Sequence, residues 1–370
     1  MTTLSIIGCG FVADLYMRSL AKYPDIKIAY VFDQDQTRKE TFCTYWGLQA
    51  AVTQSALLAD TPKGSVILNL TNPSAHYAIN SVCLKAGFHV YSEKPLAMNM
   101  DDAHKLYTLS KERDLLLACA PCSVLGEAAQ TLGAAIRAGA AGTPRLIYAE
   151  LDDGFVTQAP YGKWVSETGA PWPYKDEFKV GCTLEHAGYY LSWLIAIFGS
   201  VKTVVAASAN VVAGQDDAPD YSSATLFFET GMIARLTCSI IAPHDHQIRV
   251  IGDKAVLRLD KAWDNSAKVF IHKRVTIRRK LLELPFAKRF KLKGPTHPKL
   301  GRWGAASMNF ALGPVEMISA LQEGRPCRLS AQFALHLNEV TLAIQNAGSQ
   351  SGAQDMQTQC PPIEPMPWAR

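Results

Sequence analysis

The chain has 370 residues, of which 48% are hydrophobic and 19% are charged. This length favours two domains, and the composition excludes a disordered, collagen-like or coiled-coil protein. The 37 Lys and Arg residues exceed the 33 Asp and Glu residues by only four, and this small excess does not indicate binding to nucleic acid.

The first 120 residues alternate short apolar segments with segments of helical spacing, which is typical of βαβ units. The predicted strands cover residues 4–7, 27–32, 66–70, 89–91 and 115–118. The predicted helices cover 12–22, 36–45, 76–86 and 101–113. We therefore predict an α/β fold with an N-terminal Rossmann domain over residues 1–120, built on a doubly wound parallel sheet.

The pattern changes after Pro144 to strand-like segments separated by turn residues, which indicates an open, mostly antiparallel sheet. These segments cover 145–155, 202–212, 224–229, 232–241, 247–251 and 255–259. Helical spacing returns at 183–198, 308–323 and 331–347. We assign residues 121–370 to a C-terminal α/β domain for substrate binding and oligomerisation, whose last helices lie on its sheet or pack back on the first domain.

Two stretches do not fit this scheme. Residues 156–180 mix Pro, Gly, Trp and Tyr without periodicity, as a lid or another functional loop does. Residues 273–293 hold nine Lys or Arg against the single acid Glu283. This basic segment is either a solvated hairpin, an oligomer contact, or a site for an anionic substrate or polyanion.

The N-terminus lacks the basic and apolar regions of an export signal, and no apolar run approaches the about 18 residues of a membrane helix. The nine cysteines are odd in number and scattered, as in a reducing compartment. We therefore expect a cytoplasmic protein. Cys119 and Cys122 have metal-site spacing, but without a second such pair we interpret them as small apolar residues at a strand end.

A glycine-rich motif joins the first predicted strand to the first predicted helix, and its residues are Gly8, Cys9, Gly10, Phe11, Val12 and Ala13. The first glycine permits a tight turn, the second lets the backbone approach a pyrophosphate, and the alanine lets the helix pack closely. Asp33 ends the next strand, where its carboxylate accepts hydrogen bonds from ribose hydroxyls and repels a 2′-phosphate. The motif predicts NAD, and Arg38, which can offset that repulsion, keeps NADP open.

Further motifs follow in order: Thr71, Asn72 and Pro73 with His76, then Glu93, Lys94 and Pro95, then Gly142 to Pro144, Gly181 to Glu185, and a helix around His336. Together they resemble the glucose-fructose oxidoreductase and inositol dehydrogenase family, usually written Gfo/Idh/MocA, over nearly the whole chain. The resemblance implies that the strand-end proline and the histidine lie beside the cofactor, and that Glu93 and Lys94 lie beside the nicotinamide.

Lys94 is a candidate catalytic residue independently of any family. A lysine at the carboxyl end of a strand in a doubly wound sheet lies where ligands bind. Its ammonium can hydrogen-bond a substrate hydroxyl and stabilise the alkoxide that forms as hydride leaves the same carbon. The alternative is a salt-bridged surface lysine.

A second constellation, Glu185 to Tyr189, begins an apolar helix. The resemblance implies Asp-x-Gly-x-His here, and this chain has Glu185, Ala187 and Tyr189 in place of the three named residues. We expect Tyr189 to move the proton, because a neighbouring ammonium such as Lys94 favours the phenolate. Glu185 orients the substrate, and His186 is held in reserve as the proton-transfer group. The alternatives are a core-edge aromatic for Tyr189 and a structural helix histidine for His186.

Other side chains carry weaker signals. In the aperiodic stretch, Tyr161 and Trp164 can stack on a sugar ring and Lys163 can reach its hydroxyls, although packing at a domain edge explains them equally well. His244 and His246 resemble a ligand pair, but the sequence places no third ligand. We therefore expect no metal site.

The predicted enzyme transfers hydride reversibly between NAD or NADP and a secondary alcohol of a sugar, inositol or related polyol, in a cleft between the domains. Two alternatives remain open: an NAD-dependent glycosidase that oxidises the sugar transiently, and a sensor that binds dinucleotide without catalysis. We expect no nucleic-acid or membrane partner. The resemblance implies a homodimer or homotetramer formed through the C-terminal sheet.

Overall fold

A computed structural model describes residues 3–212, 218–302, 304–349 and 352–370. Contacts divide the chain into two units that interleave along the sequence. Unit 1 comprises Met1–Cys122, Gln158–Val180 and Asn309–Leu342. Unit 2 comprises Ser123–Thr157, Gly181–Met308 and Ala343–Arg370.

Unit 1 is built on a five-stranded parallel sheet with the strand order β2-β1-β3-β4-β5. The strands are β1 (Thr3–Ile7), β2 (Lys27–Phe32), β3 (Val66–Asn69), β4 (His89–Ser92) and β5 (Leu117–Cys119). All four residues of β3 are buried, as expected for a central strand that is covered on both faces. The predicted doubly wound Rossmann sheet is confirmed.

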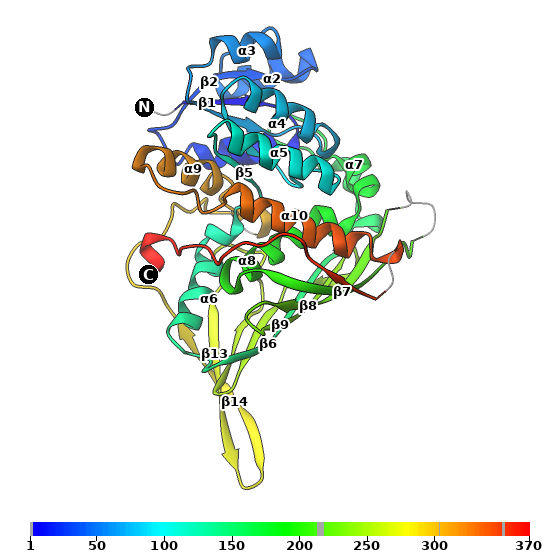
Figure 1. The fold of residues 1–370 in the computed structure, drawn as a ribbon, viewed down its shortest axis with the longest axis vertical. Helices are drawn as coiled ribbons and strands as arrows, with labels where there is room; N and C mark the ends of the chain where they lie inside the picture. The colour runs from blue at the N-terminus through cyan, green and yellow to red at the C-terminus, as the bar shows by residue number, and fades with distance from the viewer. Residues whose placement is uncertain (1–2, 213–217, 303, 350–351) are drawn as a thin grey trace. The chain divides into compact units, whose positions relative to one another are not determined.

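The helices that connect these strands begin at side-chain caps where the sequence provides them. They are α1 (Phe11–Leu20), α2 (Gln36–Trp46), α3 (Gln54–Asp60), α4 (His76–Lys85) and α5 (Met100–Glu112), with α4 and α5 side by side (Figure 1). Asp35, Thr53 and Asn99 each accept a hydrogen bond from the N–H three residues ahead. The sequence did not predict α3, because seven residues are too few to establish a helical period.

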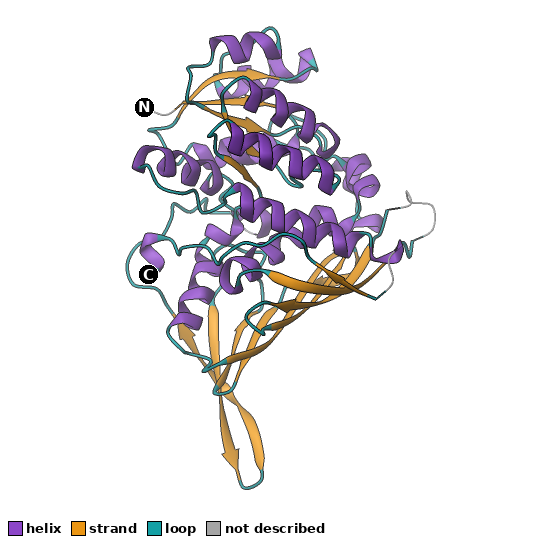
Figure 2. Ribbon diagram, in the orientation of Figure 1, coloured by secondary structure: helices purple, strands orange, loops and turns teal. Residues whose placement is uncertain are grey.

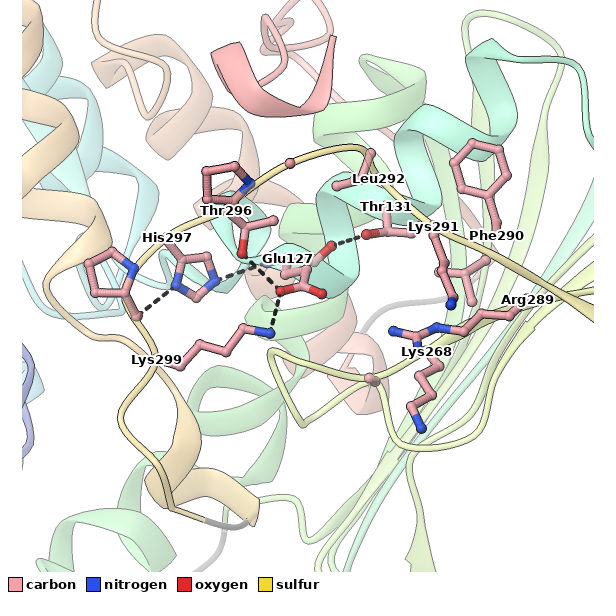
Figure 3. A pocket seen from close by; sticks show the side chains of 15 residues that line it. Glu127, Thr131, Lys268, Arg289, Phe290, Lys291, Leu292, Thr296, His297 and Lys299 are labelled. Atoms are coloured by element: carbon pink, nitrogen blue, oxygen red, sulfur yellow. Dashed lines mark hydrogen bonds and ion pairs between the residues drawn. The ribbon is translucent and has the colours of Figure 1, made fainter.

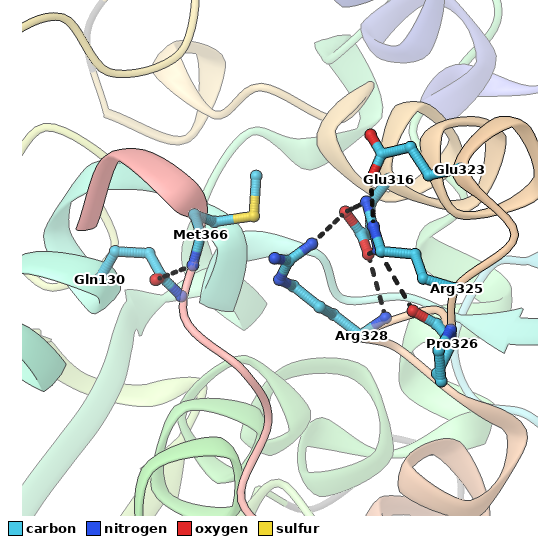
Figure 4. Close-up of polar contacts among 7 residues, drawn as sticks. All are labelled: Gln130, Glu316, Glu323, Arg325, Pro326, Arg328 and Met366. Carbon is cyan, nitrogen blue, oxygen red and sulfur yellow. Dashed lines mark hydrogen bonds and ion pairs between the residues drawn. The ribbon is translucent and has the colours of Figure 1, made fainter. Parts of the chain in front are cut away.

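Two later helices, α9 (Leu312–Glu323) and α10 (Ala331–Gln345, as far as Leu342), also belong to unit 1, and α9 packs against β3, β4 and β5. Gly313 permits this approach, since a Cβ at this position would lie 2.1 Å from the Tyr91 hydroxyl oxygen. The buried Glu316 carboxylate is paired with Arg325 at 2.6 Å and with Arg328 at 2.9 Å (Figure 4). These ion pairs compensate a charge that would otherwise be costly to bury.

Unit 2 is built on a ten-stranded sheet with the order β14-β13-β12-β11-β6-β9-β8-β7-β15, and β10 also pairs with β6 (Figure 2). Among the described strands of this sheet, only β6 and β9 pair in parallel. The prediction of a mostly antiparallel sheet is therefore confirmed. The strands are β6 (Pro144–Phe155), β7 (Val201–Ala209), β8 (Tyr221–Phe228), β9 (Ile233–Ser239), β10 (Ile241–Asp245), β11 (Ile248–Gly252), β12 (Ala255–Leu259), β13 (Val269–Ile277), β14 (Lys280–Phe290) and β15 (Ala353–Asp355).

The longer helices of unit 2 are α6 (Glu127–Arg137), which the sequence did not predict, and α8 (Gly188–Phe198). The helix expected over 183–198 is in fact a π-helical turn, Thr183–Ala187, followed by α8. The strand expected over 232–241 ends at Ser239 in β9, and β10 begins at Ile241. Within the described ranges, no helix combines the length and apolarity needed to cross a bilayer.

The basic segment forms a hairpin of β13 and β14 that extends from the end of the sheet (Figure 1). Nearly all of β14 is exposed, and the Phe286 side chain is 84% exposed. A hairpin agrees with one of the three interpretations of its charge. Oligomer contact and anion binding stay predictions.

Candidate functional site

The carboxyl ends of β1 and β3 mark the point in unit 1 where the strand order reverses, which is where ligands bind in open α/β sheets. Gly8 follows β1 with φ +102°, a conformation that glycine adopts without strain. A Cβ on Gly8 would lie 2.6 Å from the carbonyl carbon of Leu70, directly after β3. Only glycine therefore fits the turn between these two strands.

Gly10 has a different role, because an added Cβ there meets no atom within 4 Å. It is the N-cap of α1, in an extended conformation and without a side-chain cap. The first N–H groups of α1 are thus available, with the positive end of the helix dipole, to an anion. The open space and the uncapped donors fit the pyrophosphate of a dinucleotide.

Asp33 is buried beside this turn. One carboxylate oxygen accepts a hydrogen bond from the Cys9 N–H at 2.7 Å, and the other accepts from the Asp35 N–H at 2.8 Å. The carboxylate is thereby fixed, and its remaining lone pairs fit a ribose diol. Arg38 is half-exposed, with Nη1 3.8 Å from Asp33 Oδ2.

We predict that Asp33→Ser raises the kcat/KM for NADP relative to NAD by at least about tenfold, because the substitution removes a charge that opposes a 2′-phosphate and leaves Arg38 in place. Steady-state kinetics with both coenzymes measures the ratio. Asp35→Ser is the matched control, since it also removes a carboxylate, 3.4 Å from Arg38, but keeps a capping side chain for α2. An unchanged ratio in Asp33→Ser contradicts the assignment.

His76 was expected beside the cofactor, and its ring connects two backbone segments at this edge of the sheet. Nδ1 lies 2.7 Å from the Pro95 carbonyl oxygen, and Nε2 lies 2.9 Å from that of Thr71. Both nitrogens therefore face the protein backbone, and the ring holds the loops that follow β3 and β4. Burial lowers the pKa of His76, although both carbonyls favour the charged form.

This lowered pKa predicts a loss of stability in mild acid. Between the unfolded value of about 6.5 and the lower folded pKa, only the unfolded chain takes up the proton, so the unfolding free energy falls as pH decreases through this window. Urea unfolding at pH 5.5 to 7.5 should show a slope that is smaller in His76→Gln, by at most about 1.4 kcal/mol per pH unit. The exposed His104→Gln serves as control. An identical slope in His76→Gln would rule out this contribution.

Glu93 and Lys94 follow β4. The Tyr16 hydroxyl donates to Glu93 Oε1 at 2.6 Å, and the Lys94 N–H donates to Oε2 at 3.1 Å. Burial raises the pKa of the Glu93 carboxyl, although the Lys94 charge opposes the shift. Glu93 thus anchors the strand end inside unit 1, and the partly buried Lys94 follows it at the ligand-binding edge.

The aperiodic stretch belongs to unit 1 from Gln158 onward and includes η4 (Tyr161–Lys163) and α7 (Tyr174–Val180). Its aromatic rings pack against one another, with the Trp164 and Trp172 centroids 5.0 Å apart and those of Tyr161 and Phe178 5.1 Å apart. Lys163 is exposed. Ring-on-ring packing agrees with the structural alternative for Tyr161 and Trp164, and their contact with substrate stays a prediction.

This stretch is also hydrogen-bonded to residues near the glycine motif. Asn72 Nδ2 donates to Asp176 Oδ2 at 2.7 Å, and the Thr168 hydroxyl donates to Asp14 of α1 at 2.7 Å. Asn72 is exposed, and Thr71 and Pro73 are partly buried in the same loop after β3. The stretch is therefore adjacent to the dinucleotide motif within unit 1.

In unit 2, the predicted residues of the second constellation lie at the π-helical turn and the start of α8. Glu185 and His186 are buried in the turn, and Tyr189 lies in the first turn of α8. The ring of Trp263, which the sequence analysis did not single out, is 4.6 Å from that of Tyr189 and 6.1 Å from that of His186. Short π-helical segments occur frequently at functional sites.

Asp153 on β6 joins this group and was also missed. His186 Nδ1 lies 3.5 Å from one of its oxygens, while His244 Nδ1 and His246 Nε2 lie 3.6 and 3.3 Å from the other. Burial would raise the pKa of Asp153, but its contacts with these imidazoles lower it overall. A signal for this residue exists in the sequence, because the acidic pair Asp152 and Asp153 lies near the end of the strand, directly before a glycine.

A separate pocket of about 580 Å³ lies in unit 2 at the base of the basic hairpin (Figure 3). On one side, Glu127 accepts from Thr296 at 2.9 Å and pairs with Lys299 at 2.7 Å. Further cationic side chains line it, namely Lys268, Arg289 and Lys291. None of the predicted site residues contributes to this pocket.

Comparisons with known proteins agree with this architecture. The model of an oxidoreductase family with an NAD-binding Rossmann fold, Gfo/Idh/MocA, matches residues 3–120, and the model of the Gfo/Idh/MocA C-terminal domain matches residues 129–258. UDP-N-acetylglucosamine 3-dehydrogenase of Acidithiobacillus ferrooxidans is 29% identical over 145 residues, which span 39% of this chain and 44% of that protein.

Trans-1,2-dihydrobenzene-1,2-diol dehydrogenase of Mus musculus is 24% identical over 70% of this chain and 74% of its own length. A dehydrogenase from Bordetella pertussis, solved with NADH and UDP-GlcNAcA, superimposes with a TM-score of 0.72 and 16% sequence identity over 96% of this chain and 97% of that chain. The two family models together match well over half of the sequence. The chain thus belongs to the Gfo/Idh/MocA family of NAD-binding oxidoreductases.

Proposed function

We propose that this protein is an NAD(P)-dependent dehydrogenase that acts on a secondary alcohol of a sugar, inositol or related polyol. The observation that carries the proposal is the edge of the parallel sheet, where the Gly8 to Gly10 turn, Asp33 and Lys94 follow the carboxyl ends of β1, β2 and β4. The relatives named as UDP-N-acetylglucosamine, myo-inositol and D-apiose dehydrogenases support the substrate class.

A nicotinamide dinucleotide, when bound, exchanges a hydride with the carbinol carbon of the substrate. The residues of the chain bind the dinucleotide and transfer the proton of the substrate hydroxyl. The α1 N-terminus and Gly10 bind the diphosphate, and Asp33 binds the adenosine ribose, which favours NAD. The Lys94 ammonium donates a hydrogen bond to the reacting oxygen and stabilises its negative charge.

We assign the proton transfer to Tyr189 of unit 2. The Tyr189 phenol takes the hydroxyl proton in oxidation and returns it in reduction. Glu185 orients the neighbouring hydroxyls, and His186 is the alternative proton-transfer group. The Trp263 and Tyr189 rings provide an apolar surface on which the C–H face of a sugar can stack.

Two finer assignments belong to the same proposal. All nine cysteines are free and buried, which supports a reducing, cytoplasmic location. The wide sheet of unit 2 supports a homodimer or homotetramer formed through its exposed strand residues. Sedimentation of the purified protein measures the oligomer.

A substrate screen tests the function. Aldoses, inositols and linear polyols are each supplied with NAD and then NADP, and absorbance at 340 nm follows coenzyme reduction. We expect at least one sugar or cyclic polyol to give net NADH and linear kinetics. Turnover of a glycoside without net NADH would instead indicate the glycosidase, and coenzyme binding without turnover on any member would indicate a sensor.

A further inference from the structure

The strand pairing in unit 2 brings two histidines to one aspartate. Ala242 pairs with Gly154 and Asp245 with Asp152, so β10 has an additional residue opposite β6. This bulge places His244 and His246, which follow one another at alternate positions, around the carboxylate of Asp153. The ligand atoms of the three residues all lie within 4.8 Å of one another.

The separations fit an ion better than direct hydrogen bonds. His246 Nε2 and His244 Nδ1 lie 3.3 and 3.6 Å from Asp153 Oδ1. Hydrogen bonds between N–H and oxygen are usually about 2.7–3.2 Å long. Ligands bonded to a tetrahedral zinc ion at about 2.0–2.1 Å are separated by about 3.3–3.4 Å. Both nitrogen–oxygen separations are thus close to the spacing of two ligands on one ion, and the ligand atoms of the two histidines lie within 4.8 Å of each other.

A buried polar atom points to the same ligand. His246 Nε2 is buried and has no hydrogen-bond partner among the described residues. A buried group without a partner requires an explanation, and a bound cation is one. The second oxygen of Asp153 lies 3.5 Å from His186 Nδ1. This contact would orient the carboxylate through the oxygen that does not face His244 and His246.

We propose that Asp153, His244 and His246 bind one divalent transition-metal ion of the zinc class. Two imidazoles and one carboxylate are ligands that such ions prefer, whereas magnesium prefers oxygen ligands alone. Three protein ligands leave a position open, as in catalytic zinc sites. If the proposed function holds, vicinal hydroxyls of the polyol occupy that position, because Trp263 stacks on His246 at 5.5 Å and also contacts Tyr189.

Calorimetry on the full chain tests the site. The protein is stripped with a chelator, dialysed and titrated with ZnCl2, and separately with MgCl2, without coenzyme or substrate. We expect one zinc ion per chain with a Kd of about micromolar or tighter, and no magnesium binding at the same concentrations. Asp153→Asn and His246→Ala should each weaken zinc binding by at least about tenfold, with folding checked by circular dichroism.

The matched control is His272→Ala. His272 Nδ1 lies 3.4 Å from Glu283, so it is a similar histidine–carboxylate pair outside the proposed site. This variant should bind zinc as the parent does, and the nine cysteines, present in every variant, contribute equally. His244→Ala provides a third site variant. Because the His244 side chain is exposed, its removal leaves no cavity in the hydrophobic core.

The absence of stoichiometric zinc binding overturns the proposal, as does equal affinity in the parent and in all three site variants. The readout needs no turnover. A failed substrate screen with intact zinc binding therefore counts against the dehydrogenase, and the reverse result counts against the metal site alone.

Discussion

Replacement of Lys94 by alanine should reduce kcat by at least about a hundredfold while NADH binds with nearly the parental Kd. The reason is that the ammonium acts on the substrate oxygen, where negative charge develops, and not on the diphosphate or the adenosine ribose. Lys94 follows β4 at the ligand-binding edge of the sheet, and its N–H donates to the buried Glu93. Stopped-flow or steady-state assays give kcat, and fluorescence titration gives the NADH affinity.

Lys105→Ala is a suitable control, since it removes an exposed ammonium in α5 whose partner is Asp102 on the same helix. It should leave both constants unchanged. Residual activity above about a tenth in Lys94→Ala corresponds to less than about 1.4 kcal/mol of transition-state stabilisation and would exclude a catalytic role. A parallel loss of NADH affinity would instead assign Lys94 to coenzyme binding.

The parallel sheet could be predicted from the sequence because its strands appear as short apolar runs, and all of them except the edge strand β2 are almost entirely buried. β2 and β1 occur at the predicted positions to within one residue. The glycine motif could also be interpreted in advance: Gly8 was expected to permit a tight turn, and Gly10 was expected to leave space for a ligand. Both predictions rest on short segments of the sequence, although the close approach of Gly8 to Leu70 is seen only in the structure.

The remainder depends on contacts between distant residues. Asp153 and His246 are brought together by the pairing of β6 with β10. The sequence of a strand does not show which other strand it will pair with. For the same reason, the sequence analysis placed no third ligand beside His244 and His246, and the absence of a metal site was expected on that ground. Trp263 follows β12 in a turn without periodicity, so no pattern singled it out.

The second large effect concerns the two glycines of the motif, for which we expect opposite outcomes on substitution by alanine. Gly10→Ala should fold with a Tm close to that of the parent, because Gly10 has φ −75° and an added Cβ meets nothing within 4 Å. That open space is where the diphosphate is proposed to lie. The NADH Kd should therefore rise by at least about tenfold, or by about 1.4 kcal/mol.

Gly8→Ala should instead destabilise the fold itself. Its Cβ would lie 2.6 Å from the Leu70 backbone, and its φ of +102° is strained for alanine. Such backbone strain costs on the order of 1–3 kcal/mol, and the clash adds to it, so thermal unfolding should show a lowered Tm before any coenzyme is added. Calorimetric unfolding and NADH titration of both variants separate the two effects. Unimpaired NADH binding by a well-folded Gly10→Ala would show that the diphosphate does not lie at this turn, and the assignment of the coenzyme site would fail with it.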